Sequence, residues 1–274
     1  MAQPPTILAV FAHPDDEAFP TGGTLAHYAR MGHKVYLACA TRGEVGQLKD
    51  PTLALPDGSP PDMAAIRTVE LERSCQALGI EPPLFLGYHD SGRNERLRKD
   101  DPQALYNTPL WEVEARIREV IAQVQPAVLL TFDPHGGYGH PDHLVIHRAA
   151  TAAFYSSGIL PHPPRRLFYT AFTVERAAAM QKSGQRSVME GLDPQVFGVS
   201  ESTLALTLNV QEYLPQKLAA IRAHRSQFAP LVAETMPAER RAQMEGWMAV
   251  ETFTLGGTRG PVPHWPLLDM FEGL

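Results

Sequence analysis

The chain has 274 residues, of which 44% are hydrophobic and 20% are charged, and its formal net charge is −6. This length and composition are sufficient for one large domain with its own core. No run of five like charges occurs, so we expect neither a nucleic acid nor a membrane as partner, and a small molecule is favoured. The sequence leaves open whether the chain forms a homo-oligomer.

Apolar runs alternate with amphipathic stretches along the first 160 residues. Strands are predicted at 6–12, 34–40, 83–87 and 127–132, and helices at 24–32, 64–79, 110–124 and 142–155. Strands that are apolar throughout, between amphipathic helices, are typical of a mostly parallel sheet covered on both faces. The sequence therefore predicts a doubly wound, Rossmann-like α/β fold.

The pattern becomes less regular after about residue 160. Strands are predicted at 165–172 and 202–210, and a helix at 213–228 that Pro215 confines to the residues after it. We expect a C-terminal extension, residues 161–274, on the same domain as the core at 5–160. Residues 1–274 would then form a single domain.

The N-terminus and the cysteines indicate the cellular compartment. The N-terminal apolar run stops at His13 after about seven residues, so it is too short for a signal peptide or a membrane span. No basic residues precede it, as they would in a signal peptide. Cys39 and Cys75 lie in apolar or helical stretches and are predicted to be core thiols. We therefore expect a cytoplasmic protein.

Two polar clusters follow predicted strands, at residues 13–17 and 133–143. In open α/β sheets, ligands bind outside the carboxyl ends of the strands, where such loops converge. A catalytic zinc site typically uses three nitrogen or oxygen ligands and keeps a fourth position for water. His13, Asp16 and His143 would supply that set.

Asp15 stands beside one of these ligands and fits the role of a general base. Bound zinc lowers the pKa of its water to about 7, and a base is still useful to move the proton to a leaving group. The first cluster alone is also typical of a turn and helix cap. The second cluster favours the metal site, because a stiff HPDH at another strand end is hard to explain by capping. His143 and His147, four residues apart on one helix, form a rival metal pair, but no Glu follows His143 and we expect His147 to be packed or on the surface.

Taken together, the two clusters resemble the hallmarks of the PIG-L/LmbE family of zinc-dependent N-deacetylases. These are AHPDDE, here Ala12–Glu17, and HPDH, here His140–His143. The resemblance covers about residues 5–155 well and the remainder thinly. It implies that His13, Asp16 and His143 bind zinc and that Asp15 is the general base. Shorter segments are similar to the family as well: Thr41–Glu44, Arg67 with Glu70, Leu86–Gly92, and Lys217 through His224–Gln227.

The resemblance also implies roles for five further residues. His140, oriented by Asp142, and Tyr138 would assist the tetrahedral intermediate, because a cationic imidazole and a phenol can stabilise a developing oxyanion. Arg67 and Asp90 would contact the sugar. Without the resemblance, Tyr138 would be interpreted as a loop aromatic.

Two positions in these segments allow another interpretation or none. Arg67 by itself is typical of a surface helix arginine paired with Glu70 one turn on. His135, in the second cluster, could be a substrate contact, a metal neighbour or neither.

GGYGHPDH and YHDSG are most similar to the branch that handles low-molecular-weight thiols, which makes the glucosamine precursors of mycothiol or bacillithiol or cleaves their conjugates. The resemblance thus implies removal of an acetyl group from an N-acetylglucosamine conjugate, with an amidase acting on a thiol S-conjugate as the alternative. Iron(II) could replace zinc, because the same ligands accept either metal.

Two interpretations from other classes are weaker. A nucleotide-binding module is suggested by residues 21–24 and 41–46, but the spacing is not GxGxxG, and tight turns beneath the metal site are expected there instead. The presence of Asp15 and His140 disfavours a catalytically inactive metal-binding regulator.

Overall fold

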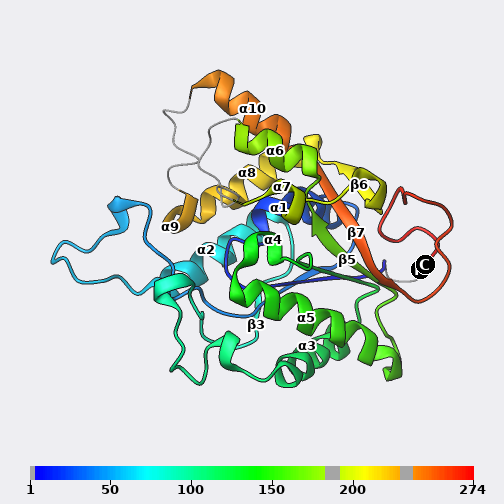
Figure 1. Cartoon of the computed structure of the whole chain (residues 1–274), viewed down its shortest axis with the longest axis horizontal. Helices are drawn as coiled ribbons and strands as arrows, with labels where there is room; N and C mark the ends of the chain where they lie inside the picture. The colour runs from blue at the N-terminus through cyan, green and yellow to red at the C-terminus, as the bar shows by residue number, and fades with distance from the viewer. Residues whose placement is uncertain (1–3, 183–191, 229–236) are drawn as a thin grey trace.

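The computed structural model describes residues 4–182, 192–228 and 237–274 (Figure 1). A seven-stranded sheet runs through the molecule in the order β3-β2-β1-β4-β5-β7-β6. Five strands are parallel: β1 (Ile7–Phe11), β2 (Val35–Cys39), β3 (Leu84–Phe85), β4 (Val128–Thr131) and β5 (Arg166–Ala171). The antiparallel strands are β7 (Val250–Thr258), beside β5, and β6 (Leu206–Asn209) at the edge.

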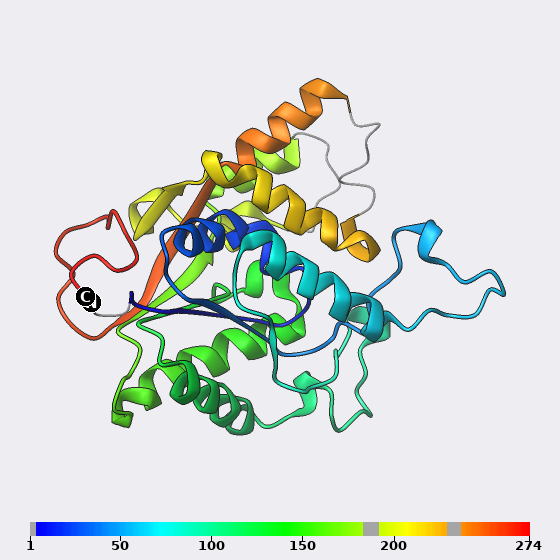
Figure 2. The ribbon, with the colours of Figure 1, turned by 180° about the vertical axis from the view of Figure 1, so that it is seen from behind.

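Helices cover both faces of this sheet (Figure 1, Figure 2). On one face pack α1 (Ala18–Arg30), α2 (Met63–Leu78) and α8 (Leu214–Ala223), and on the other α3 (Leu110–Val124) and α5 (Pro141–Ser156). The remaining α-helices of the described residues are α4 (Gly136–Gly139), α6 (Val174–Lys182), α7 (Pro194–Phe197), α9 (Arg225–Phe228) and α10 (Ala238–Met248). The 3-10 helices there are η1 (Pro51–Leu53), η2 (Asn94–Arg96), η3 (Leu105–Asn107), η4 (Ser157–Ile159), η5 (Glu201–Thr203) and η6 (Gln211–Tyr213).

The predicted doubly wound α/β fold is confirmed. Every residue of β1 and β4 is fully buried between the two helical layers, which accounts for their continuous apolar sequences. Each of the four strands and four helices predicted for the first 160 residues has a counterpart. The strand order reverses between β1 and β4. In open α/β sheets, ligands bind outside the carboxyl ends of the strands at such a point.

One boundary in this half was predicted wrongly. The helix expected at 24–32 begins at Ala18, so residues 21–24 are helical and do not form a tight turn. Gly23 explains why glycine occurs inside a helix here. A Cβ at this position would lie 2.5 Å from the Val210 side chain. The glycine therefore serves close packing of α1 against the segment that follows β6.

The C-terminal residues complete the sheet. Strands β5 and β6 were expected, whereas β7, α6 and α10 were not. The predicted helix at 213–228 begins at Leu214, because Pro215 is tolerated in a first turn that needs no N–H, and it is divided at His224 into α8 and α9. The predicted extension also includes residues 183–191 and 229–236, which lie outside the described residues.

A buried ion pair joins α8 to β7. The Lys217 Nζ donates to Glu251 Oε1 at 2.6 Å, and both side chains are 1% exposed. The Glu251 carboxylate also accepts the backbone N–H groups of Gly23 and Thr24 in α1. This pair ties three elements together.

We expect Lys217→Met to lower the free energy of unfolding by about 3–5 kcal/mol, because it leaves the Glu251 charge buried without its cation. Denaturant unfolding measures this change. Lys49→Met, at an exposed position, is the control and should change the free energy by less than about 0.5 kcal/mol. A loss below about 1 kcal/mol for Lys217→Met would contradict the structural role of the pair.

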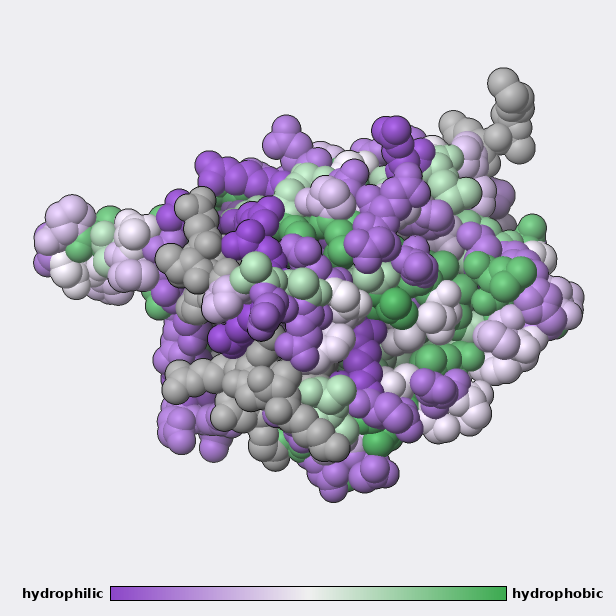
Figure 3. Space-filling view, turned by 90° about the horizontal axis from the view of Figure 1, so that it is seen from above, coloured by the Kyte–Doolittle hydropathy of each residue, from purple (hydrophilic) through white to green (hydrophobic). Residues whose placement is uncertain are grey.

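Residues 51–61, between β2 and α2, project from the body of the molecule (Figure 1, Figure 3). Most of these residues are exposed. None of the helices within the described ranges is both long enough and apolar enough to cross a membrane.

Candidate active site

The two polar clusters meet at the carboxyl ends of β1 and β4, where the strand order reverses. His13 lies two residues after the end of β1, just before the turn that leads into α1, and His143 lies in the first turn of α5, which follows β4. Their side chains are buried, with 6% and 1% of their surface exposed. The strand-end location that the sequence predicted is therefore where these groups come together.

The three predicted metal ligands form a tight triangle. The distance from His13 Nδ1 to His143 Nε2 is 3.2 Å. The Asp16 carboxylate oxygens lie 3.4 Å from His13 Nδ1 and 3.2 Å from His143 Nε2. Two imidazole nitrogens and one carboxylate thus face a common point.

Hydrogen bonds on the outer side of each ring fix which nitrogen faces inward. His143 Nδ1 lies 3.0 Å from the Gly136 carbonyl, and His13 Nε2 lies 3.0 Å from Asp142 Oδ2. Because both partners only accept, these nitrogens carry protons, and His13 Nδ1 and His143 Nε2 are the nitrogens that face Asp16. In the neutral rings these two nitrogens supply lone pairs. A Cβ at Gly136 would lie 2.6 Å from the His143 Cβ, so glycine is needed for this approach. Three converging acceptors require a cation, so the residues fit a metal ion.

The electrostatics of the site agree with this requirement. Burial alone would lower the pKa of His13, but the carboxylates of Asp90, Asp142 and Asp16 raise it well above its usual value. Burial alone would raise the pKa of Asp16, but His143 and His13 lower it well below its usual range. The cluster therefore stabilises positive charge at its centre.

Other ligand sets share His13. His13, His140 and His143 could together hold a metal, as could His13, Asp90 and Asp142, with ligand atoms within 4.8 Å of one another in each set. The second set uses the outer nitrogen of His13, which already donates to Asp142. His140 is a rival to Asp16 for the third ligand position, and the choice of Asp16 stays a prediction.

Asp15 lies beside this cluster with its carboxylate 19% exposed. Burial raises its pKa to about 6, although the Arg67 guanidinium, 3.2 Å from Asp15 Oδ2, opposes the shift. Arg67 is itself buried and also donates to the carbonyls of Gly43 and Pro14. The surface pairing of Arg67 with Glu70 is thus wrong, because Glu70 is buried and accepts hydrogen bonds from Ser226.

His140 and Asp142 meet through the backbone. The Asp142 N–H donates to His140 Nδ1 at 3.2 Å, so the proton of a neutral His140 sits on Nε2. The Asp142 carboxylate reaches His13 instead and accepts the N–H of Ser91. Burial, together with the neighbouring His13 and His143, lowers the pKa of His140 to about 2. A pKa this low favours a neutral ring at pH 7, in contrast to the cationic imidazole expected from the sequence. A neutral ring can offer its Nε2–H as a donor.

Tyr138 stands next to these rings. Its ring centroid lies 5.0 Å from that of His143 and 6.1 Å from that of His140, and the Arg93 guanidinium lies 5.3 Å from it. Burial first, and then the Asp16 charge, raise the pKa of the phenol above its usual value, so it stays protonated. A protonated phenol at this position can donate a hydrogen bond.

Asp90 contacts His13 and the backbone of its own loop. Its Oδ1 lies 3.5 Å from His13 Nε2 and accepts the N–H of Gly92. The charge on His13 lowers the pKa of Asp90 despite its burial. Asp90 and Arg67 are 3% and 4% exposed and bond to the protein, so their contact with a sugar stays a prediction.

Two histidines lie apart from the cluster. His147 Nδ1 bonds to the Phe132 carbonyl at 2.8 Å and the ring packs 4.7 Å from Tyr169, so it is a packed histidine. His135 is exposed, with its ring 5.2 Å from that of Phe197. His147 and His135 are absent from the ligand sets described above.

The sequence did not predict that three buried residues near Asp15 support the site. They are Glu17, Ser74 and His224. Ser74 and His224 Nε2 both hydrogen-bond to the Glu17 carboxylate. The sequence did signal Glu17 through the AHPDDE segment and His224 through the similar segment at His224–Gln227, but neither signal reveals the partner.

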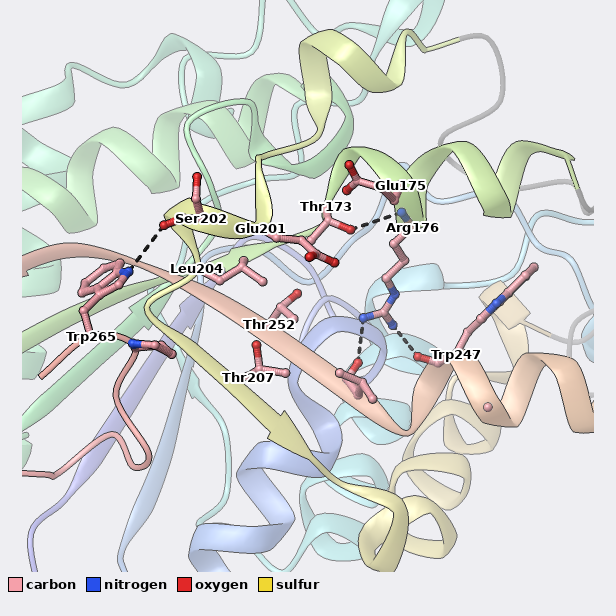
Figure 4. A pocket seen from close by; sticks show the side chains of 13 residues that line it. Thr173, Glu175, Arg176, Glu201, Ser202, Leu204, Thr207, Trp247, Thr252 and Trp265 are labelled. Atoms are coloured by element: carbon pink, nitrogen blue, oxygen red, sulfur yellow. Dashed lines mark hydrogen bonds between the residues drawn. The ribbon is translucent and has the colours of Figure 1, made fainter.

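A separate pocket of about 710 Å³ lies near the β6 edge of the sheet, between β6, β7, α6 and α10 (Figure 4). Trp247 and Trp265 stand at opposite ends of it, and Arg176 is tied to the carbonyls of Trp247 and Val250. None of the predicted site residues lines this pocket.

Comparisons with known proteins find relatives over most of the chain. The sequence profile of the PIG-L family, described as GlcNAc-PI de-N-acetylase, matches residues 8–154. A relative from Salinispora arenicola, named 1D-myo-inositol 2-acetamido-2-deoxy-alpha-D-glucopyranoside deacetylase, is 33% identical over 98% of this chain and 91% of its own. A relative of the same name from Nocardiopsis dassonvillei is 34% identical over 97% of this chain and 100% of its own.

The likeness extends to solved structures. The crystal structure of a conserved protein from Thermus thermophilus matches with a TM-score of 0.60 at 25% identity, over 96% of this chain and 99% of that one. The two relatives also align with the C-terminal residues, beyond the part that the family profile matches. The chain belongs to the PIG-L family of de-N-acetylases.

Proposed function

We propose that this protein is a zinc-dependent hydrolase that removes the acetyl group from an N-acetylglucosamine conjugate. One observation carries the proposal: His13 Nδ1, His143 Nε2 and the Asp16 carboxylate converge within 3.4 Å of one another, beside the Asp15 carboxylate. Two family members that align over nearly the whole chain are named as deacetylases of an inositol-linked N-acetylglucosamine. This similarity favours a small amino-sugar conjugate as substrate.

His13, Asp16 and His143 would hold the zinc ion. The bound ion supplies Lewis acidity toward the acetyl carbonyl and toward water. Asp15 takes the proton from the attacking water and returns it to the nitrogen of the leaving amine, so that acetate and a free amine are formed. Iron(II) is compatible with the same ligands.

Two neutral donors assist the oxyanion that forms on the acetyl carbonyl. His140 presents Nε2–H, because its Nδ1 is occupied by the Asp142 N–H, and Tyr138 presents a protonated phenol. Fixed donors of this kind stabilise negative charge as it develops without reorganisation of solvent. The Asp142 carboxylate orients His13, and Arg67 holds Asp15. We assign the contacts with the sugar to Arg67 and Asp90.

The proposal predicts the acidic limb of the pH profile. Asp15 must be ionised to accept a proton, so kcat/KM should rise with pH through its pKa and fall about tenfold for each pH unit below it. Burial raises this pKa to about 6, and a bound cation would lower it. We expect the limb at or below about pH 6, measured with saturating metal. A limb centred above about pH 7 would show that another group is the base.

A panel of conjugates tests the substrate class. We would measure release of primary amine from inositol-linked, malate-linked and free N-acetylglucosamine, and from diacetylchitobiose, with metal-loaded enzyme. We expect a linked monosaccharide to be cleaved best, and the preferred aglycone to be the inositol carried by the relatives' named substrate. Failure of all four substrates would overturn the deacetylase proposal.

The alternative is cleavage of a larger amide, such as a thiol S-conjugate, with the same residues. Bacillithiol or mycothiol conjugates in the same panel distinguish the two functions. An acetyl conjugate turned over faster than any S-conjugate supports the deacetylase.

A further inference from the structure

The backbone of Asp15 is in an uncommon conformation. Its φ angle is +118°, in a region that residues with a side chain rarely adopt. Such conformations cluster at functional sites and persist only where neighbouring groups hold them. The direction in which the Asp15 carboxylate points therefore depends on what fixes this turn.

Glu17 holds the turn from within the protein. The Asp15 N–H donates to Glu17 Oε2 at 3.0 Å, and the Asp15 carbonyl accepts the N–H of Ala18 at 3.1 Å. Glu17 itself is fully buried. Among the described residues, the Glu17 carboxylate is the only side-chain group that accepts a hydrogen bond from the Asp15 N–H.

His224 and Ser74 in turn hold Glu17. The Ser74 hydroxyl donates to Glu17 Oε1, and His224 Nε2 lies 2.7 Å from the same oxygen. All three residues are fully buried. A carboxylate buried this deeply is stable only when donors surround it, so its position depends on these two partners.

His224 is fixed because it lies at the corner between α8 and α9. Ser226, two residues on, donates to both oxygens of Glu70 in α2 at 2.7 and 2.6 Å. The Ser226 carbonyl accepts the N–H of Lys49 at 2.7 Å. Hydrogen bonds therefore hold this corner against α2 and the loop after β2, and they fix the position of His224.

We propose that Glu17 and His224 are positioning residues that hold Asp15 in the orientation needed for proton transfer. Through His224, the C-terminal part of the chain contributes to catalysis at the N-terminal cluster. The inference rests on the proposed function, because it takes Asp15 as the general base.

Replacing His224 tests the inference. His224→Leu removes the donor to Glu17 and should lower kcat about 10- to 100-fold, as is usual for residues that orient others in a site. KM should change less than about threefold and the bound metal should stay at one equivalent, because neither substrate nor metal is contacted. His224→Gln keeps an N–H donor and should restore most of kcat. His162→Gln, at an exposed position, should leave kcat unchanged.

Repeating the His224 substitution in Asp15→Asn enzyme distinguishes a positioning role from a general loss of structure. In Asp15→Asn enzyme no base remains to be positioned, so adding His224→Leu should lower kcat less than about twofold. A full 10- to 100-fold loss in that background as well, or loss of metal in His224→Leu, would overturn the inference.

If His224→Leu is not recovered as folded protein, judged by thermal unfolding, Ser74→Ala replaces it. This variant removes the other donor to Glu17 Oε1 and should lower kcat in the same direction, again only when Asp15 is intact. Wild-type kcat for either variant, with Asp15→Asn inactive, would overturn the positioning role alone. Wild-type kcat for Asp15→Asn would instead overturn the base assignment within the proposed function.

Discussion

Asp15→Asn enzyme should bind one equivalent of metal and lose about 10²- to 10⁴-fold in kcat, the usual contribution of a general base. The Asp15 carboxylate is outside the triangle formed by His13, Asp16 and His143, so its loss leaves all three ligands in place. The amide of asparagine is close in size but cannot take a proton from water. Steady-state kinetics and elemental analysis of the same preparation measure the two quantities.

Asp57→Asn is a matched control, because this carboxylate only accepts hydrogen bonds from Ser59 in the projecting segment. Its kcat should equal that of the wild type. Turnover within about threefold of wild type in Asp15→Asn would show that another group moves the proton. Loss of metal in Asp15→Asn would show that Asp15 is a ligand.

His143→Ala should greatly weaken metal binding, and activity at ordinary zinc concentrations should be lost with it. The substitution removes one of three ligands, whereas changing only the groups that orient ligands typically costs 10- to 100-fold in metal affinity. We therefore expect affinity for zinc to fall by more than about 100-fold, measured by competition with a chelating dye. Activity should return only in part at high zinc concentrations.

His147→Ala is the matched control for this variant. His147 lies one turn further along the same helix, and its ring bonds to the Phe132 carbonyl, outside the cluster. Its loss should leave zinc affinity unchanged. Equal weakening in both variants would favour a metal site built from the two helix histidines and would contradict the ligand set of His13, Asp16 and His143.

The fold and the place of the candidate site could be predicted because their signals are local. His13 and Asp16 closely follow β1, and His143 lies in the first turn of the helix after β4. Parallel topology brings the ends of such strands to one edge. Strand β7 could not be recognised in this way. Its buried Glu251 interrupts the apolar pattern and is stable only because Lys217, 34 residues away, reaches it.

The properties that depend on packing could not be predicted either. The contact between Glu17 and His224 joins residues 207 positions apart, and it exists only because α8 packs against α1 and α2. His140 was expected to be cationic, whereas its burial and the neighbouring His13 and His143 lower its pKa. The buried state of Arg67 likewise depends on the path of the loop after β2, which supplies the Gly43 carbonyl.

Zinc titration of the metal-stripped protein tests the central claim most directly. Acetate and primary amine released from inositol-linked N-acetylglucosamine would be measured together as zinc is added. We predict no activity without metal, equal amounts of the two products, and a rate that rises until one equivalent of zinc is bound. Full activity of the stripped protein, or no release of acetate at one equivalent of bound zinc, would contradict the proposed metal-dependent deacetylation.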